Sequence, residues 1–587
     1  MSRIGMQLSD HQSVILRGIA LGLTKWDFSN LPDYKGHHPL ILPYGLDGVD
    51  LIDLRIQRPV GYRGVMLYHG TTSKAYIGRP SQLPNYASRI AIQAITSRTQ
   101  TTVLTDDPHA GAAEACYLLV DPDVTCVNAD AVAGGFSYLP HQELVWATIA
   151  AGGVNGTVTF TRVKTDVYDG VAGLSATYGA NSYLVPISVS TNINFIGGHC
   201  MGKDAAGVYG ASSAALSNMQ LVGVDGLTFS GGFLHEGHEY DGIAGILVRN
   251  IEVDDCDFGD SNAGTTAGKG YPMALYGYAN LLVNNSRFYD GLRNFIYGSY
   301  GAMSKVIQFC RGTDLQNDYP VLNAGHGIGF AYNQGIWDNE FAGDSIGGIG
   351  AGSTVHGCGD INVSILRNKL NGGGDIQIHM SCENVLIQGN DGSDYEAPNS
   401  QAIGGAIILV GATDRTMGSG AIVGGVPAGP VGPKDISAIG NRMERIYTSG
   451  SFLPGGATRW QGFCHILGNH FDNAAVTSGR PIEMQNLYAD SSLKIGGNTI
   501  IHRGSFSAVL INGNGVSVTA EYGEMTVDGE DYGPNAVQHT DGGNSSDGIT
   551  LSGTGVISGD GENSMTGGSG TLVTVGGSWS GEVEEDL

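Results

Sequence analysis

Two histidine–carboxylate pairs with the same spacing lie in neighbouring stretches of the chain. Asp360 follows His356 by four residues, and Glu383 follows His379 by four residues. If these stretches stack as neighbouring strands, about 4.8 Å apart, the four side chains converge. Two carboxyl groups about 5–5.5 Å or 6.5–9.5 Å apart can cleave a glycosidic bond. We therefore predict these four residues as candidate catalytic residues, although two polar turns that merely align would give the same pattern.

Aspartates form a second recurring set, a few residues after each unit of the repeat described below. They are Asp260, Asp290, Asp314, Asp344, Asp375 and Asp394. Aspartate is frequent in turns because its side chain can bond its own backbone, so the set can be purely structural. A line of carboxylates could instead hold Ca²⁺ or contact a sugar. We predict that Asp344 and Asp375 bind substrate. We assign no metal site and no required cofactor, and Ca²⁺ is the one metal considered.

Tyrosines form a third recurring set, on the strands that precede the repeat units. Outward-facing Tyr rings suit the flat faces of sugars, and their hydroxyl groups can hydrogen-bond to a saccharide. Inward aromatic stacking is the alternative, but it buries a hydroxyl group that then needs a partner. We predict three of them as substrate-binding residues: Tyr276, Tyr297 and Tyr332.

A fourth polar group is local. Residues 235–241 read His-Glu-Gly-His-Glu-Tyr-Asp, so two histidines and three carboxylates fall within seven residues. The two histidines are three residues apart, whereas the helical HExxH zinc motif places them four apart. We interpret this segment as a solvated polar loop or as part of a carbohydrate groove.

The charge of the chain restricts its partners. The net charge is −26, from 30 Lys and Arg against 56 Asp and Glu. Nucleic acids and anionic membrane surfaces both attract basic surfaces, so we predict neither as a partner. An anionic polysaccharide would need a local basic patch or bridging cations. The sequence also contains no GxSxG nucleophile elbow and no P-loop, which excludes serine-hydrolase and P-loop nucleotide chemistry of the usual kind.

The cysteines and the N-terminus bear on the compartment. The chain has eight cysteines and no CxxC pair, so we predict free, buried thiols, as in a protein folded in a reducing cytoplasm. Residues 1–23 contain one short apolar run interrupted by Arg17 and no small-residue cleavage site. We therefore predict neither a signal peptide nor a membrane-inserted segment.

The elements that must position these residues come from a repeat. Its unit is an apolar residue, two variable residues, Asn or another small residue, one variable residue and usually a second apolar residue. The unit recurs at residues 195–200, 224–229, 253–258, 283–288, 307–312, 336–341, 365–370, 387–392, 439–443, 467–471 and 495–500. Most steps are 22–30 residues, and the one step of 51 holds either one rung with an insertion or two rungs.

A repeat of this length that is rich in strand residues and Gly predicts an all-β parallel β-helix solenoid. The Asn column has a physical reason, because stacked amides can each donate to the next rung and Asn tolerates the left-handed backbone of a sharp turn. We predict a non-repeating N-terminal segment at 1–110, which either caps the β-helix or attaches it to a particle. Irregular early rungs are expected at 111–190, regular rungs from about 191 to 504 with an insertion at 394–434, and a C-terminal β-rich domain at 505–587.

The Asn-centred rungs over about residues 190–504 resemble the right-handed β-helices of the pectate-lyase-like superfamily. The N-terminal segment, Gly-rich β-helix, β-rich C-terminus and free cysteines together resemble the tailspikes of bacteriophages and of phage-derived particles. This resemblance implies a homotrimer on a virion or phage-like particle that binds host capsule or lipopolysaccharide, and in many relatives cleaves it as an endoglycosidase. The Arg/Lys and Asp cluster of pectate lyases is absent, which favours hydrolysis or binding over lyase chemistry.

Two other functions fit the same sequence. The chain could be a polysaccharide lyase, hydrolase or epimerase independent of a virus, although such a secreted enzyme would normally carry an export signal. It could also be a purely adhesive or structural solenoid, which would leave the carboxylate and aromatic columns without a ligand. Whether the leading function includes catalysis stays open at this stage.

Overall fold

The structure is a computed structural model of the chain. It describes residues 6–7, 12–17, 25–27, 40–42, 46–57, 65–67, 89–97, 99–104, 114–126, 139–150, 155–162, 178–186, 190–202, 219–238, 241–261, 271–290, 295–313, 321–323, 331–342, 349–351, 360–371, 374–379, 382–392, 405–410, 433–449, 462–472, 480–485, 487, 491–501, 509–512, 518–522, 525–528, 537–540, 549–551, 554–555, 557–558, 563–566, 573–575 and 578–579. These residues belong to two compact units, one centred on Met1–Tyr332 and the other on Asn333–Met417 and Ala428–Leu587.

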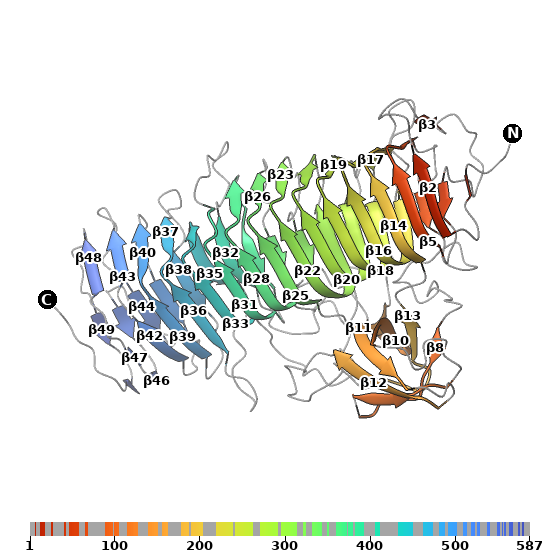
Figure 1. Cartoon of the computed structure of the whole chain (residues 1–587). Helices are drawn as coiled ribbons and strands as arrows, with labels where there is room; N and C mark the ends of the chain where they lie inside the picture. Colours follow the sequence, from red (N-terminus) through yellow and green to blue (C-terminus); the bar gives the residue numbers. More distant parts are fainter. Residues whose placement is uncertain are drawn as a thin grey trace. The chain divides into compact units, whose positions relative to one another are not determined.

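Long parallel strands form the rungs of the first unit. β14 (Ser190–Ile196), β16 (Met219–Ser230), β18 (Asp241–Asp254), β20 (Tyr271–Asn284) and β22 (Ile296–Gln308) pair in that order, as the successive arrows in Figure 1 show. The pairing aligns one buried apolar column: Phe195, Phe229, Val253, Val283 and Ile307. Each of these strands pairs in parallel with the equivalent strand of the next rung, so the predicted parallel β-helix is confirmed.

A second sheet of the first unit is made of short strands that follow each rung's turn. Its strands are β3 (Lys25–Asp27), β6 (Arg55–Gln57), β15 (His199–Met201), β17 (Leu234–His238), β19 (Asp257–Ser261), β21 (Arg287–Tyr289) and β23 (Arg311–Thr313). This register corrects one rung of the predicted repeat. Phe229, not Val224, aligns with Val253, so Phe233 takes the turn position that Leu227 was expected to hold.

The second unit has the same construction. One set of parallel strands is β28 (Asp360–Leu366), β31 (Glu383–Gln388), β33 (Lys434–Ile439), β36 (Phe463–Leu467) and β39 (Ser491–Gly496). A second set is β30 (Ile376–Ile378), β32 (Ala406–Val410), β35 (Arg445–Ser449), β38 (Ile482–Gln485) and β41 (Val509–Asn512). The buried column of the first set is aliphatic throughout: Ile365, Ile387, Ala438, Ile466 and Ile495.

The predicted Asn column is a continuous hydrogen-bonded ladder in the second unit. Its members are Asn339, Asn368, Asn390, Asn441, Asn469 and Asn498, all almost fully buried. Asn441 shows the pattern. Its Oδ1 accepts from the backbone N–H and from Nδ2 of Asn390, both at 3.0 Å, and its Nδ2 donates to Oδ1 of Asn469 and to the Ile387 carbonyl, both at 2.9 Å. Each amide donates to the next rung, as predicted, and its polar atoms are satisfied despite burial.

The ladder also resolves the 51-residue step. Asn390 bonds Asn441 directly, and β31 pairs with β33. The step is therefore one rung with an insertion, and the strand predicted inside it is β32.

The left-handed residue of the turn is the one before the Asn, not the Asn itself. Gly389, Gly440, Gly468 and Gly497 have φ between 62° and 66° at this position. In the first unit Gly232, Asp255 and Asn285 take it, with φ of 76°, 54° and 45°. Asn tolerates this geometry, as predicted, but the column that needs it lies one residue earlier, where Gly is the least strained choice.

Phe309 occupies this left-handed position with φ of 54°, and its side chain is 56% exposed. A bulky side chain in the left-handed region costs about 1–2 kcal/mol, because its Cβ crowds the following carbonyl. Replacing Phe309 with Asn should therefore raise the free energy of unfolding by about 1 kcal/mol, measured as a higher thermal midpoint. A lower midpoint would show that the ring is needed for folding.

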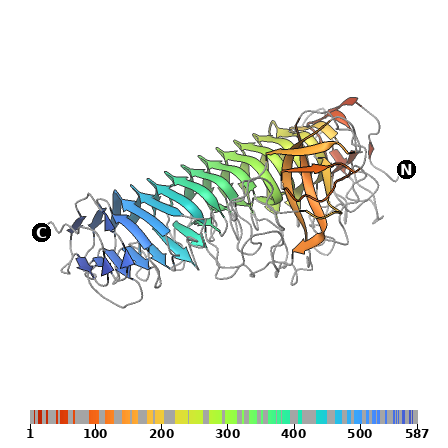
Figure 2. The ribbon, with the colours of Figure 1, turned by 90° about the horizontal axis from the view of Figure 1, so that it is seen from below.

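Residues 90–186 differ from the expected early rungs. They contain six antiparallel strands in the order β8 (Ile90–Ala91), β13 (Tyr183–Pro186), β10 (Ala115–Cys126), β11 (Leu139–Ile149), β12 (Thr157–Arg162) and β9 (Gln100–Thr102). A bridge between Ile92 and Val103 joins the two edges, so the strands close into a small barrel beside the rungs (Figure 2). The prediction of parallel rungs here is wrong.

Burial on both faces of β10 explains the error. Tyr117 and Leu119 point into the barrel core, whereas Cys116, Leu118 and Val120 pack with Val222, Ile246, Leu247 and Ala279 of the rungs. A strand that is apolar on both faces has the same sequence pattern as a buried rung strand. The alternation of apolar and polar residues that marks a strand with one solvent-exposed face is absent.

The stack of parallel rung strands extends beyond its predicted limits at both ends. β2 (Gln12–Arg17) and β5 (Asp47–Ile52) pair in parallel, and β5 continues to β14. At the other end β41 pairs with β44 (Val537–Thr540), β44 with β45 (Ile549–Leu551), and β45 with β49 (Val573–Val575). Strands of the N-terminal segment are thus rungs of the first unit, and strands of the C-terminal segment are rungs of the second unit.

Six cysteines have side chains that the structure describes, and all six are free and buried, as predicted: Cys116, Cys200, Cys256, Cys310, Cys382 and Cys464. Burial raises the pKa of the Cys256, Cys310 and Cys464 thiols to about 12. They therefore pack as small apolar groups rather than as nucleophiles.

Candidate functional site

Three of the four predicted catalytic residues, Asp360, His379 and Glu383, lie near one turn of the second unit. The register pairs Ile361 with Glu383, so Asp360 lies beside Cys382, and its backbone N–H donates to Cys382 Sγ at 3.4 Å. The Cys382 N–H in turn donates to the carbonyl of His379 at 3.3 Å. His356 lies outside the described residues.

This turn is closed to a polymer. Asp360 is 3% exposed and His379 is 8% exposed. Burial lowers the pKa of His379 to about 4, so its imidazole is neutral at pH 7. A saccharide chain cannot reach side chains covered to this degree without displacing their cover. The catalytic role of these residues stays a prediction.

Glu383 has a partner of its own. Its Oε1 accepts from Lys434 Nζ at 3.4 Å, and the same ammonium lies 3.3 Å from Asp435. The one-residue offset between Asp360 and Glu383 matters, because neighbouring positions of a strand point to opposite faces. Asp360 is on the buried side, whereas Glu383 lies with Lys434 nearer the surface.

The predicted aromatic residues are placed differently from one another. Tyr297 is 3% exposed and stacks on Tyr271, with ring centroids 4.6 Å apart, so it follows the inward alternative rather than the surface one. Tyr276 lies in β20 and Tyr332 in β25 (Ala331–Trp337), but their side chains are outside the described part, as is Asp344. Their substrate contacts stay predictions.

Asp375 lies at a different place, directly before β30. Its Oδ1 accepts from the backbone N–H of Ala406 at 3.0 Å, and Ala406 pairs with Arg445 on the next strand. Burial raises the pKa of Asp375 to about 7, against the opposing effects of the Ala406 N–H, Arg445 and Gln377. A carboxyl group that changes charge near neutral pH can act as a proton donor or as a neutral hydrogen-bond donor.

A column next to Asp375 carries an aromatic ring, and its members are half-buried except Ile408, which is 6% exposed. The register aligns Gln377 with Ile408, Tyr447 and Glu483 on β30, β32, β35 and β38. The Arg445 guanidinium lies over the Tyr447 ring, 4.2 Å from its centroid. Burial raises the pKa of Tyr447; Arg445 lowers it, and Asp375 and Glu483 raise it. The phenol therefore lies within the electrostatic reach of both carboxyl groups.

Glu483 completes this set. Its Oε1 accepts from the Gln485 side-chain amide, and Arg480 lies 3.8 Å away. We call Asp375, Gln377, Arg445, Tyr447 and Glu483 the Tyr447 face. It presents an aromatic ring braced by a cation, the Glu483 carboxyl group and an amide on one side of three strands, which are groups that bind sugars, whereas the Asp375 carboxyl group beside them is 4% exposed.

The spacing of the two carboxyl groups favours binding over paired catalysis. Asp375 and Glu483 lie on strands three steps apart, roughly 14 Å at about 4.8 Å per strand. Glycosidases hold their two carboxyl groups about 5–9.5 Å apart.

The sequence identified Asp375 but missed Arg445, Tyr447 and Glu483. Gln377, Tyr447 and Glu483 form one column, yet they follow Asn368, Asn441 and Asn469 by 9, 6 and 14 residues. Turns of different length hide a column that only the strand register shows. The usable signal was the run Arg445-Ile-Tyr447 close behind an Asn turn.

A second polar group lies in the first unit, where the sequence predicted a solvated loop. His199 Nε2 lies 3.2 Å from Glu236 Oε1, and the Tyr289 hydroxyl donates to Glu236 Oε2 at 3.0 Å. His235 is instead fully buried, and its pKa falls to about 3 because of desolvation. Residues 234–238 form strand β17, so the described part of the segment is a rung and not a loop.

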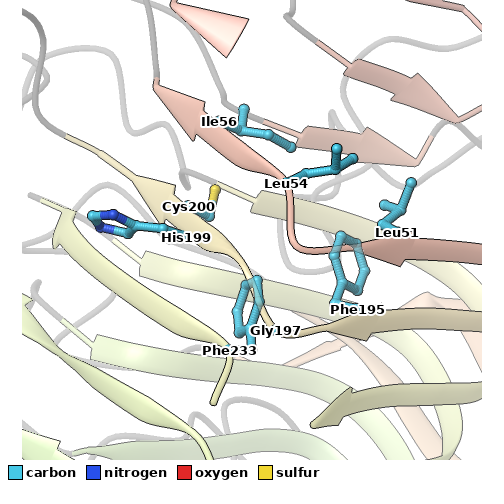
Figure 3. Close-up of a pocket in the computed structure, with 8 residues that line it drawn as sticks. All are labelled: Leu51, Leu54, Ile56, Phe195, Gly197, His199, Cys200 and Phe233. Carbon is cyan, nitrogen blue, oxygen red and sulfur yellow. The ribbon is translucent and has the colours of Figure 1, made fainter. Parts of the chain in front are cut away.

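One cavity lies inside the first unit. Leu51, Leu54, Ile56, Phe195, Gly197, His199, Cys200 and Phe233 line it, and Figure 3 shows the His199 ring pointing away from Leu51, Phe195 and Phe233. Its lining is almost entirely apolar, so it is a packing gap of the core rather than a saccharide site.

Two negative observations concern the described residues alone. No group of three or more His, Cys, Asp and Glu side chains there is arranged to hold a metal ion. No helix among them has the length and apolarity to cross a bilayer.

Comparison with solved structures returns β-helical proteins. The chain is similar to the tailspike of Pseudomonas phage phi297, with 12% identity, a TM-score of 0.35 and coverage of 97% of this chain and 70% of that one. It is similar to the tailspike of Acinetobacter baumannii bacteriophage AP22, solved in complex with A. baumannii capsular saccharide, with 9% identity, a TM-score of 0.29 and coverage of 96% and 70%.

A third similar structure is the catalytic domain of a GH87 α-1,3-glucanase in complex with nigerose, with 9% identity, a TM-score of 0.32 and coverage of 83% and 88%. No family model and no curated protein matches the chain. Phage tailspikes, the class that the sequence resembles, are thus among the matching structures. The fold assignment itself stands on the strand register described above.

Proposed function

We propose that the chain is a phage-type spike that binds polysaccharide of the host cell surface, capsule or lipopolysaccharide, through the Tyr447 face. The observation that carries this proposal is the Tyr447 ring, which stacks with Arg445 at 4.2 Å and has Glu483 beside it on the next strand. An aromatic ring among hydrogen-bonding groups on a rigid sheet suits a sugar ring. The apolar ring face covers the sugar's C–H groups while the polar groups bind its hydroxyls.

The test uses two variants of one residue. Replacing Tyr447 with Ala should weaken binding to a purified host capsule or lipopolysaccharide at least tenfold in isothermal titration, because it removes the stacking surface. Replacing Tyr447 with Phe keeps the ring and should retain most of the affinity. Equal affinities for wild type and Tyr447→Ala would exclude the Tyr447 face as the site.

Hydrolysis is the second candidate function, and Asp375 is the residue that favours it. Its pKa of about 7 suits a general acid, but its side chain is 4% exposed, so catalysis requires that the bound saccharide displace the groups that cover it. New reducing ends after incubation with the bound polysaccharide would indicate hydrolysis, and unsaturated ends would indicate a lyase. If Asp375 is the acid, Asp375→Asn should lower the rate of reducing-end release at least 100-fold while binding persists.

Assembly completes the proposal. We propose that three chains form the spike and that the N-terminal segment attaches it to a virion or virion-like particle after folding in the bacterial cytoplasm. Such a spike would present its solenoid to the host surface. Native mass measurement of the intact protein would give three times the chain mass, and a monomer mass would contradict the trimer.

A further inference from the structure

The Tyr289 side chain reaches across a neighbouring strand of the first unit. Tyr289 belongs to β21, its hydroxyl group donates to Glu236 Oε2 of β17 at 3.0 Å, and β19 lies between these two strands. Two strand steps span roughly 10 Å, so the aromatic ring must lie along the sheet to reach that far. The ring is therefore held at both ends, by its own backbone and by the Glu236 carboxyl group.

A glycine leaves the space that this ring occupies. Gly259 of β19 aligns with Glu236 on one side, and the pairing of Phe258 with Phe288 places it beside Tyr289 on the other. A Cβ atom at residue 259 would lie 2.5 Å from Tyr289 Cδ2 and Cε2, closer than two such atoms can approach. Glycine weakens the interior of a strand and is found where another group must approach the backbone closely. Here that group is an aromatic ring on the outer surface of the sheet.

The rest of this column leaves the ring accessible. Met201 aligns with Glu236 on the far side from Gly259, and Thr313 follows Tyr289 on β23. Met201 and the Tyr289 ring are half-buried, whereas Thr313 is exposed. The Glu236 side chain is 25% exposed, and its Oε1 lies 3.2 Å from His199 Nε2. A ligand can therefore reach both the ring and the carboxyl group that holds it.

An exposed ion pair lies beside the ring in the adjacent column. Arg287 donates to Asp257 through Nε at 3.1 Å and through Nη2 at 3.3 Å, and the two side chains are 57% and 42% exposed. The Arg287 guanidinium carbon lies 5.1 Å from the Tyr289 ring centroid. Leu234 flanks Asp257 in this column, and Arg311 flanks Arg287. Because Asp257 engages two donors of Arg287, this guanidinium braces the surface more than it offers a charge to a ligand.

The charges that act on the Tyr289 hydroxyl group favour an uncharged ligand. Burial raises the pKa of Tyr289, Glu236 and Asp257 raise it further, and Arg287 lowers it. The phenol therefore keeps its proton and donates to Glu236 at neutral pH. An anionic sugar beside the ring would meet the same two carboxylates and be repelled. The hydroxyl groups of a neutral sugar can instead donate to them.

The same three side-chain types meet on the Tyr447 face of the second unit. There the Arg445 guanidinium lies 4.2 Å from the Tyr447 ring centroid, and Glu483 aligns with Tyr447. Each unit thus presents a tyrosine ring with an arginine and a glutamate beside it. This combination offers a ring for the C–H groups of a sugar and polar groups for its hydroxyls.

We propose that Glu236, Asp257, Gly259, Arg287 and Tyr289, which we call the Tyr289 face, form a second saccharide subsite that takes uncharged sugar units. This inference rests on the proposed function and adds a site and a ligand class to it. The Tyr289 ring stacks on a pyranose, and Glu236 and Asp257 accept hydrogen bonds from its hydroxyl groups. We expect this to be the weaker of the two sites, because the donors of Arg287 are already engaged.

The test counts binding sites by isothermal titration with an oligosaccharide cut from a capsule or lipopolysaccharide that the wild type binds. The wild type should bind two molecules per chain. Gly259→Ala should bind one, because its Cβ displaces the ring while every other group stays in place. Tyr289→Leu, which keeps an apolar side chain beside Gly259, should also bind one. Both variants should keep the affinity of the Tyr447 face, and Tyr447→Ala should keep only the weaker site.

Thr499→Ala is the matched control, at an exposed position of a short strand in the second unit, and should bind two molecules. Thermal unfolding of each variant shows whether it is folded. Chemical reduction of any carboxylates in the oligosaccharide to alcohols should leave the affinity of the Tyr289 face unchanged or higher. Loss of this site on reduction would show that it takes acidic sugars, and the proposed ligand class would be wrong.

The remaining outcomes separate the two proposals. If folded Gly259→Ala and Tyr289→Leu still bind two molecules, or if the wild type binds one molecule that Tyr447→Ala loses, this inference is wrong and the proposed function stands. If the wild type binds one molecule that only the Tyr289 face variants lose, the Tyr447 face is wrong and this inference stands. If the wild type binds no capsule or lipopolysaccharide, both proposals are wrong.

Discussion

Replacing Asn441 with Ala will lower the free energy of unfolding by about 3–5 kcal/mol. The variant loses four hydrogen bonds within the core of the second unit. It also leaves the backbone N–H of Asn390 and the Ile387 carbonyl buried without these partners, and each unsatisfied buried group costs about 1–3 kcal/mol. Denaturant unfolding followed by circular dichroism measures the difference.

The matched control for this prediction is an Asn that bonds along the solenoid at the surface. Asn362 donates to Asn333 at 3.1 Å and accepts from Asn384 at 2.7 Å, but it is exposed and has φ of 57°. Asn362→Gly keeps the left-handed backbone available and removes both bonds, so it should cost less than about 1 kcal/mol, because water replaces them. Equal losses for the two variants would show that the buried ladder has no special role.

Replacing Asp375 with Asn will raise the free energy of unfolding by about 2–4 kcal/mol at pH 8 and leave it almost unchanged at pH 4. In the unfolded chain an Asp has a pKa of about 3.9, whereas burial holds the folded value at about 7. The folded state therefore keeps a proton that the unfolded state releases. The contribution of Asp375 to the free energy of unfolding is therefore highest below pH 4 and falls as the pH rises to about 7. The loss is about 1.4 kcal/mol for each unit by which the folded pKa exceeds the unfolded pKa.

Asn removes this dependence and keeps the contact. Its side-chain oxygen can still accept from the Ala406 N–H, and it carries no charge to desolvate. Unfolding curves of both proteins at pH 4, 6 and 8 measure the effect. A difference that does not change with pH would mean that the pKa of Asp375 is the same in the folded and unfolded states, so burial does not raise it.

The solenoid could be predicted from the sequence because one column repeats for a physical reason. The ladder from Asn339 to Asn498 needs the same side chain in every rung, since each amide is both donor and acceptor for its neighbours. In the first unit Cys256, Ser286 and Cys310 fill the column, and the weaker pattern there is where the rung at 224–229 was misplaced. The repeat is therefore easiest to recognise in the sequence where the Asn hydrogen-bond ladder is continuous.

The barrel and the candidate site could not be predicted by the same means. The barrel strands have two apolar faces, so Leu118 and Leu119 give no period that separates an inserted antiparallel module from a rung. The Tyr447 face joins residues from three strands, β30, β35 and β38, that are separated by turns of unequal length. Burial also reverses expectations, because Asp360 and His379, which were predicted as catalytic residues, lie beneath the surface.

The central claim is that saccharide binds on the Tyr447 face, and a structure of the protein with an oligosaccharide of a capsule or lipopolysaccharide that it binds tests this most directly. We predict a pyranose ring stacked on Tyr447, with its hydroxyl groups bonded to Arg445 and Glu483. A saccharide bound only at a surface away from Tyr447, or a wild-type protein that binds no capsule or lipopolysaccharide, would contradict the claim.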